Sequence, residues 1–417
     1  MCCTDQPRQR MIPDRGVMQR PTYSVPFGRL LAAAVVILFC TAGAAEAREQ
    51  EEHASEETPL IRHVVIEAAT DQTPRSDTAS VAELSHGRLM VVYHKYERGK
   101  HSGHDHGICR IWSKVSDNGG ETWKDPRMLV DVEPGDVSVM MPAITKLRDG
   151  GLLLICQRIH SPYGREATML LFRSGDDGAS FVEQPPIWRR RSGFPIQGGA
   201  GTLVELSSGR LLLPYHAQGR PKMGLTVWCQ LSDDQGKTWR RSNGSIELPK
   251  RGAMEASVAE LADGSLLMSL RTQLGGPYLS RSSDGGKTWS EPIFSGLVGG
   301  ESCTCLRRIP GTNGIVLFWN NSQYNDGHHH FGERTPLAAA LSSDDGKSWQ
   351  IIGNIADDPQ AEYTNLDCLF TSQGDAVLTY MHAKPAWNRN RIHLKAALIP
   401  RSWFSKEAGA KNVHRKQ

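Results

Sequence analysis

The chain has 417 residues, of which 39% are hydrophobic and 22% are charged, an ordinary balance for a globular protein. This balance argues against extensive disorder and against a membrane protein with many spanning segments. The formal net charge at pH 7 is only +3, so charge gives no reason to expect nucleic acid or an anionic membrane surface as the main partner.

The first 47 residues have the order of an export signal. Five arginines precede the apolar run 30–40, which leads into Ala45, Glu46 and Ala47. The run is short for crossing about 30 Å of hydrocarbon. We therefore expect a signal peptide over residues 1–47, a secreted or periplasmic mature chain, and no stable membrane insertion after cleavage.

Six cysteines remain beyond residue 47, and no two of them form a Cys-x-x-Cys pair. Cys303 and Cys305 are two residues apart in an expected strand, where alternation would place both side chains on one face. We expect core positions or a disulfide for them and not a zinc site. The histidine-rich segments 101–106 and 328–330 lack a recognised ligand spacing, so the sequence predicts no metal and no other cofactor.

An eight-residue turn recurs five times along the chain. Its form is Ser-x-Asp-x-Gly-x-Thr/Ser-Trp, with Asn118 in the Asp place of the first copy and Phe181 in the Trp place of the second. An Asp accepts backbone N–H groups, a Gly supplies an unusual φ, and the aromatic ring packs into the core. We therefore interpret the repeat as structural. The copies are 116–123, 174–181, 232–239, 282–289 and 342–349.

A second repeat, a Gly-containing hairpin between β-rich stretches, occurs six times. The hairpin glycines are Gly87, Gly150, Gly209, Gly264, Gly314 and Gly374. Six such units predict an all-β fold, a six-bladed β-propeller over residues 60–403. A strand at residues 61–67 is expected to complete the sixth blade, with a flexible leader at 48–59 and a basic tail at 404–417.

The position seven residues beyond each hairpin Gly is polar in five of the six repeats. Because the innermost strands of a propeller end around its axis, polar residues at equivalent places can converge on one ligand. The sequence therefore predicts a ligand-facing rim. Its candidate members are His94, Gln157, His216, Arg271 and Asn321, with Met381 in the sixth repeat.

The repeated turns, together with the segment from Glu255 to Arg271, resemble the sialidase superfamily, in particular bacterial exo-sialidases with Asp-box repeats. The resemblance extends over residues 60–403 and supports the propeller. The turns are specific for fold and weak for activity, because hydrolases, lyases and binding proteins all carry them.

The resemblance implies an arginine triad that binds a sugar carboxylate through paired, charge-assisted hydrogen bonds. Arg271 and Arg334 match the second and third arginines. Asp77 stands where the first would be, and Arg75 lies two residues earlier. An even offset keeps a residue on the same strand face, so we expect Arg75 to take this role if a bulge or register change absorbs the offset.

The resemblance also implies a tyrosine nucleophile polarised by a glutamate, because a neutral phenol can approach an anomeric carbon that already bears a carboxylate. Tyr363 and Glu255 match these two places. Asp105 is the expected acid that protonates the leaving oxygen. His94, His216 and Asn321 complete the expected substrate contacts.

The expected function is therefore an exo-acting glycoside hydrolase with a retaining mechanism. It would remove a terminal acidic sugar, sialic acid or a similar one, from a glycan or acidic polysaccharide. Two alternatives stay open on the sequence: a hydrolase or lyase acting on another anionic polysaccharide, and a glycan-binding propeller without catalysis.

Overall fold

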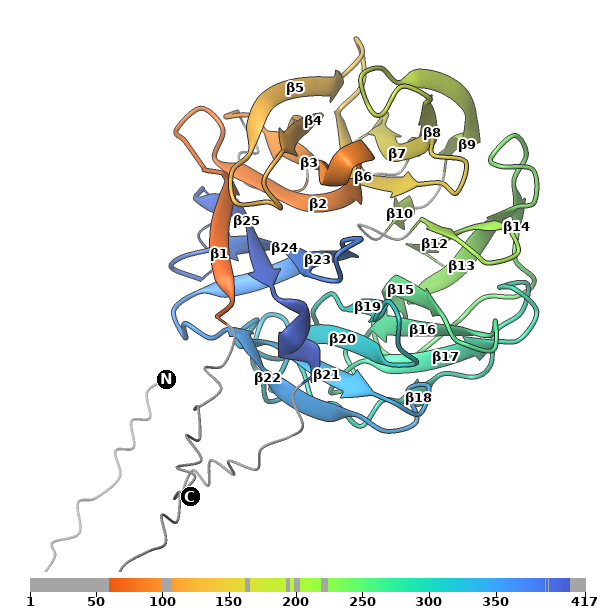
Figure 1. The fold of residues 1–417 in the computed structure, drawn as a ribbon, viewed down its shortest axis with the longest axis vertical. Helices are drawn as coiled ribbons and strands as arrows, with labels where there is room; N and C mark the ends of the chain where they lie inside the picture. The colour runs from red at the N-terminus through yellow and green to blue at the C-terminus, as the bar shows by residue number, and fades with distance from the viewer. Residues whose placement is uncertain are drawn as a thin grey trace, which may run out of the picture. The chain divides into compact units, whose positions relative to one another are not determined.

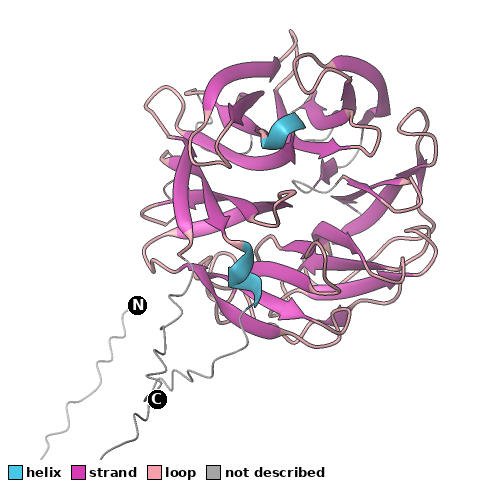
Figure 2. Cartoon of the chain, in the orientation of Figure 1, coloured by secondary structure: helices cyan, strands magenta, loops and turns pink. Residues whose placement is uncertain are grey.

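The computed structural model describes residues 60–405, except 100–104, 106, 162–165, 193–195, 199–202, 219–223, 387 and 389. The expected export signal, the leader and residues 406–417 of the tail lie outside this part. β-Strands make up nearly all of its regular structure (Figure 2). Among the described residues, no helix is long and apolar enough to cross a membrane.

The described strands pair as antiparallel ladders that follow the sequence repeats. The first ladder is β2 (Arg75–Glu83), β3 (Leu89–Tyr96), β4 (Cys109–Ser116) and β5 (Lys124–Val130). The second is β6 (Ser138–Lys146), β7 (Leu152–Ile159), β8 (Glu166–Ser174) and β9 (Val182–Ser192). The third is β10 (Ile196–Gly198), β11 (Val204–Glu205), β12 (Leu211–Gln218), β13 (Leu225–Ser232) and β14 (Arg240–Arg241).

The second half of the chain repeats this order. The fourth ladder is β15 (Met254–Glu260), β16 (Leu266–Arg271), β17 (Tyr278–Ser282) and β18 (Ile293–Phe294). The fifth is β19 (Cys305–Arg308), β20 (Ile315–Asn320), β21 (Leu337–Ser342) and β22 (Gln350–Ala356). The sixth is β23 (Glu362–Phe370), β24 (Ala376–Ala383), β25 (Ile392–Ile399) and β1 (Arg62–Glu67).

The two ends of the described chain meet in the sixth ladder. Strand β1 pairs antiparallel with β25, with Arg62 opposite Leu398, which confirms the predicted closing strand. A parallel pairing of Arg75 with Ile392 joins this ladder to the first one. In Figure 1 the orange β1 runs beside the blue β25, so the first and last strands of the described chain close the fold.

The first strand of each ladder faces the middle of the molecule. Strand β2 contacts β6 and β23, β15 contacts β19, and β19 contacts β23. Figure 1 shows the ladders arranged around a common centre. The all-β propeller prediction is therefore confirmed, and the innermost strands bring residues from distant parts of the chain to one axis.

The same pattern of hydrogen bonds recurs within each of the five eight-residue turns. In the fourth copy, Ser282 Oγ donates to Asp284 Oδ1 at 2.8 Å and accepts the N–H of Gly286 at 2.9 Å. The hydroxyl of Thr288 donates to Asp284 Oδ2 at 2.6 Å. Gly286 has φ +82°, and a Cβ there would lie 2.3 Å from Leu212. Glycine is therefore required for both conformation and space.

The aromatic residues of these turns pack at equivalent places, each against a core cluster. They are Trp123, Phe181, Trp239, Trp289 and Trp349. All five are only partly buried. Each therefore covers the edge of its core cluster and does not fill the interior of that cluster. Beyond β25, a 3-10 helix at Arg401–Ser405 buries Trp403 and Phe404. Core packing thus continues just past residue 403, the predicted limit of the propeller.

Candidate active site

Four of the innermost strands carry a β-bulge at the same place. Pairing shifts register after Asp77 in β2, after Met140 in β6, after Met254 in β15 and after Thr364 in β23. One residue with positive φ lies at each shift, five residues before the strand ends: Thr78 (45°), Met141 (56°), Glu255 (38°) and Asn365 (55°). We call this place the axial position.

Cys303 occupies the axial position of the fifth ladder, five residues before Arg308, which ends β19. Its thiol lies 2.6 Å from Glu255 Oε2 and 3.5 Å from Asn365 Oδ1. Three neighbouring ladders therefore place a carboxylate, a thiol and an amide in contact. The axial residue of the third ladder lies outside the described residues.

Arg271 contacts two carboxylates next to this group. Its Nη1 donates to Glu255 Oε2 at 2.7 Å, and its Nη2 lies 3.3 Å from Glu301 Oε1. Arg271 is the last residue of β16 and pairs with Met254, just before the bulge. The pairing register therefore fixes arginine and glutamate side by side.

A second group lies in the first ladder, around Arg75. Arg75 Nη1 donates to Asp105 Oδ1 at 2.7 Å, while Nε lies 3.0 Å and Nη2 2.9 Å from Asp77 Oδ2. Asp77 also contacts His94 Nε2. Asn365 Nδ2 donates to Asp77 Oδ2 at 2.9 Å, so Asn365 links the Arg75 group to Cys303 and Glu255.

Arg334 supplies a third buried guanidinium. Its Nη1 donates to Glu362 Oε1 at 2.7 Å, and both residues are buried. Burial and the charge of Arg271 lower the pKa of Arg334. Arg75, Arg271 and Arg334 are each at least 92% buried, and each has a carboxylate partner, as buried charges require.

The surroundings of Glu255 and Cys303 determine which of the two is ionised at neutral pH. Burial alone would raise the pKa of Glu255, but Arg271 and His216 outweigh it and lower this pKa to about 2. Burial, together with the Glu255 carboxylate, raises the pKa of Cys303 to about 11. At neutral pH, Glu255 is therefore a carboxylate and Cys303 a thiol that donates to it.

His94 and His216, both predicted to contact substrate, hold the bulges of the neighbouring ladders. His216 Nδ1 accepts the N–H of Glu255 at 3.2 Å, and His94 Nδ1 accepts the N–H of Met141 at 3.5 Å. Both rings are buried. In the first and third ladders, the residue seven positions beyond the hairpin Gly therefore bonds to the backbone of the axial residue in the next ladder.

Burial of neutral histidines makes stability depend on pH. Burial lowers the pKa of His216, His330 and His382 to about 4. Between about pH 6.5 and 4 the unfolded chain binds protons that the folded chain does not, so the free energy of unfolding falls as pH falls. His216 alone is expected to contribute about 3 kcal/mol to this loss.

Urea unfolding measured between pH 7 and pH 4 checks this expectation. His216→Asn keeps an acceptor near the Nδ1 position and should flatten the dependence. His86→Asn, in an exposed turn with φ +59°, is the matched control and should leave it unchanged. An equal dependence in wild type and His216→Asn would contradict the assignment.

Among the predicted catalytic and arginine residues, Arg75, Asp105, Glu255 and Arg271 lie in one connected network, with Arg334 beside it. Tyr363 donates its backbone N–H to Arg334 O at 2.9 Å, but its ring does not join the network. It is 4% exposed and packs in the apolar cluster with Tyr380 and His382, at ring-centroid distances of 5.8 Å and 5.6 Å.

The predicted pairing of Tyr363 with Glu255 is therefore not formed in the described structure. Tyr363 precedes the β23 bulge, and the axial position belongs to Asn365, two residues later. Asn321 also lies apart from the network: it is half-buried just beyond β20 and donates its backbone N–H to Pro336 O at 3.1 Å. Its neighbour Asn320 instead lines a small cavity with Arg271.

Sequence reasoning missed Cys303 and Asn365. The signal that finds them is the axial position, which lies nine residues before the hairpin Gly in four ladders and is displaced by the longer hairpin in the fifth. Cys303 and Cys305 also do not share one face, since Cys305 packs in the apolar cluster with Tyr363. All six described cysteines are free and buried.

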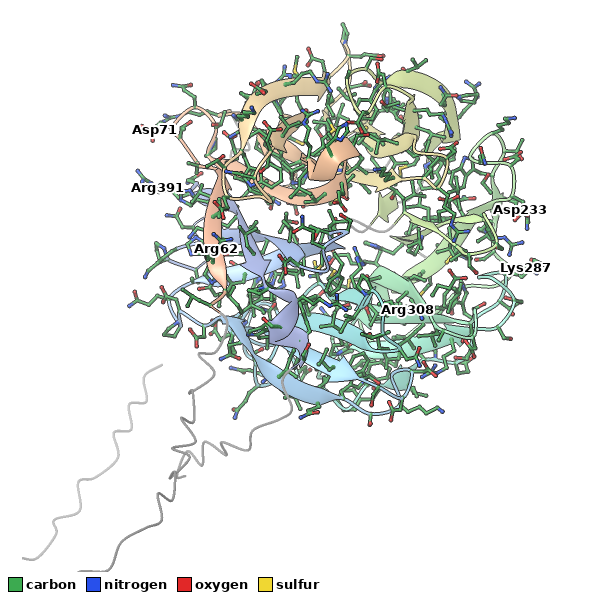
Figure 3. The ribbon with its side chains drawn as sticks, viewed as in Figure 1. Arg62, Asp71, Asp233, Lys287, Arg308 and Arg391 are labelled. Carbon is green, nitrogen blue, oxygen red and sulfur yellow. The ribbon has the colours of Figure 1, made fainter. Side chains whose placement is uncertain are left out.

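A larger cavity, of about 580 Å³, lies at the other end of the innermost strands. Several of its charged groups already have partners: Glu83 accepts from Ser372, Glu260 accepts from Ser207, and Arg307 pairs with Asp367. In Figure 3, Arg308 from its lining lies nearer the middle of the molecule than Asp233 and Lys287. These contacts join neighbouring ladders, so we assign this end a structural role.

Comparison with known proteins supports the fold and the family. Residues 87–376 match the model of the BNR repeat-like domain. An anhydrosialidase of Macrobdella decora is 28% identical over 249 residues, covering 54% of this chain and 31% of that protein. A sialidase of Bacteroides fragilis is 25% identical over 268 residues, covering 55% of this chain and 45% of that protein. The chain thus spans less than half the length of either relative.

The solved structures agree on the architecture. A Trypanosoma rangeli sialidase in complex with 2,3-difluorosialic acid, described as a covalent intermediate, superposes with a TM-score of 0.64 at 15% identity, covering 81% of this chain and 59% of that one. The resemblance to the sialidase superfamily is thereby confirmed at the level of fold. Because the matched residues make up well over half of its length, the chain belongs to the BNR repeat-like domain family.

Proposed function

We propose that the chain is a glycosidase that releases a terminal acidic sugar, sialic acid or one like it, from a glycan. The observation that carries this proposal is the gathering of Arg75, Arg271 and Arg334 beside Glu255 and Asp105. A guanidinium stays charged and matches a carboxylate with two parallel hydrogen bonds. Relatives that are named sialidases support the same substrate class.

The two carboxylates are suited to different tasks. Glu255 is ionised and mostly buried, with 19% of its side chain exposed, so it can accept a proton from a nucleophile. The Asp105 side chain is 60% exposed, so it can reach a leaving oxygen and then a water molecule. A substrate carboxylate arriving at Arg75 can replace Asp105 there, which frees Asp105 for this work.

A retaining mechanism is part of the proposal, because a nucleophile beside a base and a separate acid are its required parts. Tyr363 as that nucleophile stays a prediction from the resemblance, and its packing against Tyr380 and His382 gives it no support. We further propose that the protein acts outside the cytoplasm, on the strength of the signal-like first 47 residues.

A substrate screen of the mature chain tests the function. Aryl and lactose-linked sialosides should be hydrolysed, whereas uronic-acid and sulfated polysaccharides should not. Arg271→Lys should lower kcat/KM on the order of 10²-fold, because an ammonium cannot reproduce the paired hydrogen bonds. Arg308→Lys, an exposed arginine at the other end of β19, is the matched control and should keep full activity.

Two results of this screen would contradict the proposed hydrolase and identify another function. Cleavage of a uronic-acid polysaccharide with formation of an unsaturated sugar would identify a lyase. Binding of sialosides without turnover by wild type would identify a glycan-binding propeller.

A further inference from the structure

Cys303 holds the central axial position of the site. Its thiol donates to Glu255 Oε2 at 2.6 Å, and it is flanked by Asn365 and by the Arg271 guanidinium, whose Nη1 lies 3.9 Å from Sγ. Arg271 Nε is buried and has no hydrogen-bond partner among the described residues. A buried arginine with an unused donor points to an anionic ligand beside the thiol.

The chemistry of an acidic sugar restricts the nucleophile. Its anomeric carbon bears a carboxylate, so a charged carboxylate nucleophile would be repelled. A neutral group that gives its proton to a base during attack avoids this repulsion. Cys303 is a neutral thiol in contact with an ionised glutamate. A substrate carboxylate bound at Arg271 offsets the positive charge that lowers the pKa of Glu255, which lets Glu255 take the thiol proton.

No other described side chain at the axial positions is a neutral group that can give its proton to Glu255. Asn365 carries an amide and Met141 a thioether, neither of which gives up a proton, and among the described contacts none joins the Thr78 hydroxyl to Glu255. Tyr363, two residues before the axial position of its strand, packs in the apolar cluster. The other described cysteines lie in apolar clusters.

We propose that Cys303 is the nucleophile of the glycosidase reaction and that Glu255 is its base. This inference rests on the proposed function and names the group that attacks the sugar. In the first step, Sγ forms a bond to the anomeric carbon while the bond from that carbon to the leaving oxygen breaks. The thiol proton passes to Glu255. The leaving oxygen takes a proton from Asp105, which has taken up that proton from solvent after the substrate carboxylate displaced it from Arg75.

The second step restores the enzyme. The Asp105 carboxylate takes a proton from water, and the water oxygen bonds to the anomeric carbon as the carbon–sulfur bond breaks. Glu255 returns its proton to sulfur. Two inversions give net retention, and no oxidant, reductant or metal takes part.

Trapping of the intermediate tests the inference. Wild-type protein is incubated with 2,3-difluorosialic acid, digested and mapped by mass spectrometry. We expect a sialyl adduct on the peptide that contains Cys303. An adduct on Tyr363, or hydrolysis with inversion and no adduct, would overturn the inference while leaving the glycosidase function in place.

Matched variants separate chemistry from packing. Cys303→Ala is expected to lose at least 10³-fold in kcat without a comparable rise in KM, and Cys303→Ser should also be strongly impaired. Cys305→Ala, two residues away in the apolar cluster, should keep activity near that of wild type. If Cys303→Ala hydrolyses sialosides within tenfold of wild type, Cys303 is not the nucleophile. If wild type hydrolyses no acidic glycoside, the proposed function itself fails.

Discussion

Glu255→Gln is expected to lower kcat on sialosides by about 10³-fold with little loss of folded protein, since proton transfer by a positioned carboxylate contributes about 10²–10⁴-fold. The amide oxygen can still accept from Arg271 and Cys303, so the network should persist. What is lost is the ability to take a proton. Steady-state kinetics on an aryl sialoside, with a thermal unfolding curve for each protein, measures both effects.

Glu260→Gln provides the control for this variant. Glu260 ends the same strand, β15, and its carboxylate accepts the backbone N–H of Ser207 at 2.7 Å in the neighbouring ladder. Its loss should weaken the contact between ladders and leave kcat unchanged. A Glu255→Gln protein that retains activity within threefold of wild type would exclude Glu255 as the base.

Asp77→Ala is expected to lower the free energy of unfolding by about 3–5 kcal/mol, the range for breaking a buried ion pair. Asp77 is fully buried between Arg75, His94 and Asn365. Its removal leaves a buried guanidinium and an imidazole without their carboxylate. Urea unfolding at pH 7 measures the loss.

The comparison with Asp105→Ala makes this test specific. Asp105 pairs with the same Arg75 at 2.7 Å, but its side chain is 60% exposed. Exposed pairs contribute about 1 kcal/mol or less, so this variant should fold almost as stably as wild type while losing activity. Equal destabilisation by the two substitutions would contradict the distinction between structural and accessible carboxylates.

The repeats of this fold could be predicted because their chemistry is local. In each eight-residue turn, the Ser hydroxyl bonds both to the Asp side chain, or to that of Asn118 in the first copy, and to a Gly N–H within five residues, as Ser282 does with Asp284 and Gly286. The closing strand was also predictable, since the sixth repeat lacked an outer strand and the segment 61–67 was free to supply it. The spacing of the repeats and the residues of the turns were therefore enough to predict the propeller.

The site could be predicted only in part, because bulges decide which side chains face the axis. Glu255 and Arg271 pair across one hairpin, so their contact follows from local register. In β23 a bulge gives the axial position to Asn365, whereas the resemblance favoured Tyr363. Cys303 was expected in the core or in a disulfide, because no two cysteines form a Cys-x-x-Cys pair and alternation would place it on one face with Cys305. Cys303 and Glu255 both lie five residues before the end of an innermost strand. This shared position is what indicates that the Cys303 thiol contacts the Glu255 carboxylate.

Asp77 shows how one departure from a family pattern can be accommodated. The carboxylate stands where an arginine was expected, and Arg75 pairs with it at 2.9 Å while also holding Asp105. A register shift lies between Asp77 and Ala79, but β6, β15 and β23 carry the same shift, so it does not by itself explain the two-residue offset. Arg75 keeps Asp77 as a buried counter-ion, and its role toward a substrate carboxylate stays a prediction.

If the network around Glu255 hydrolyses an acidic glycoside with retention at the anomeric carbon, proton NMR of an α-sialoside during the first turnovers of the mature protein will show it. We expect free sialic acid to appear first as the α anomer and then to mutarotate, with no release by Glu255→Gln. First appearance of the β anomer, or no release of sugar by folded wild-type protein, would exclude retaining hydrolysis by this site.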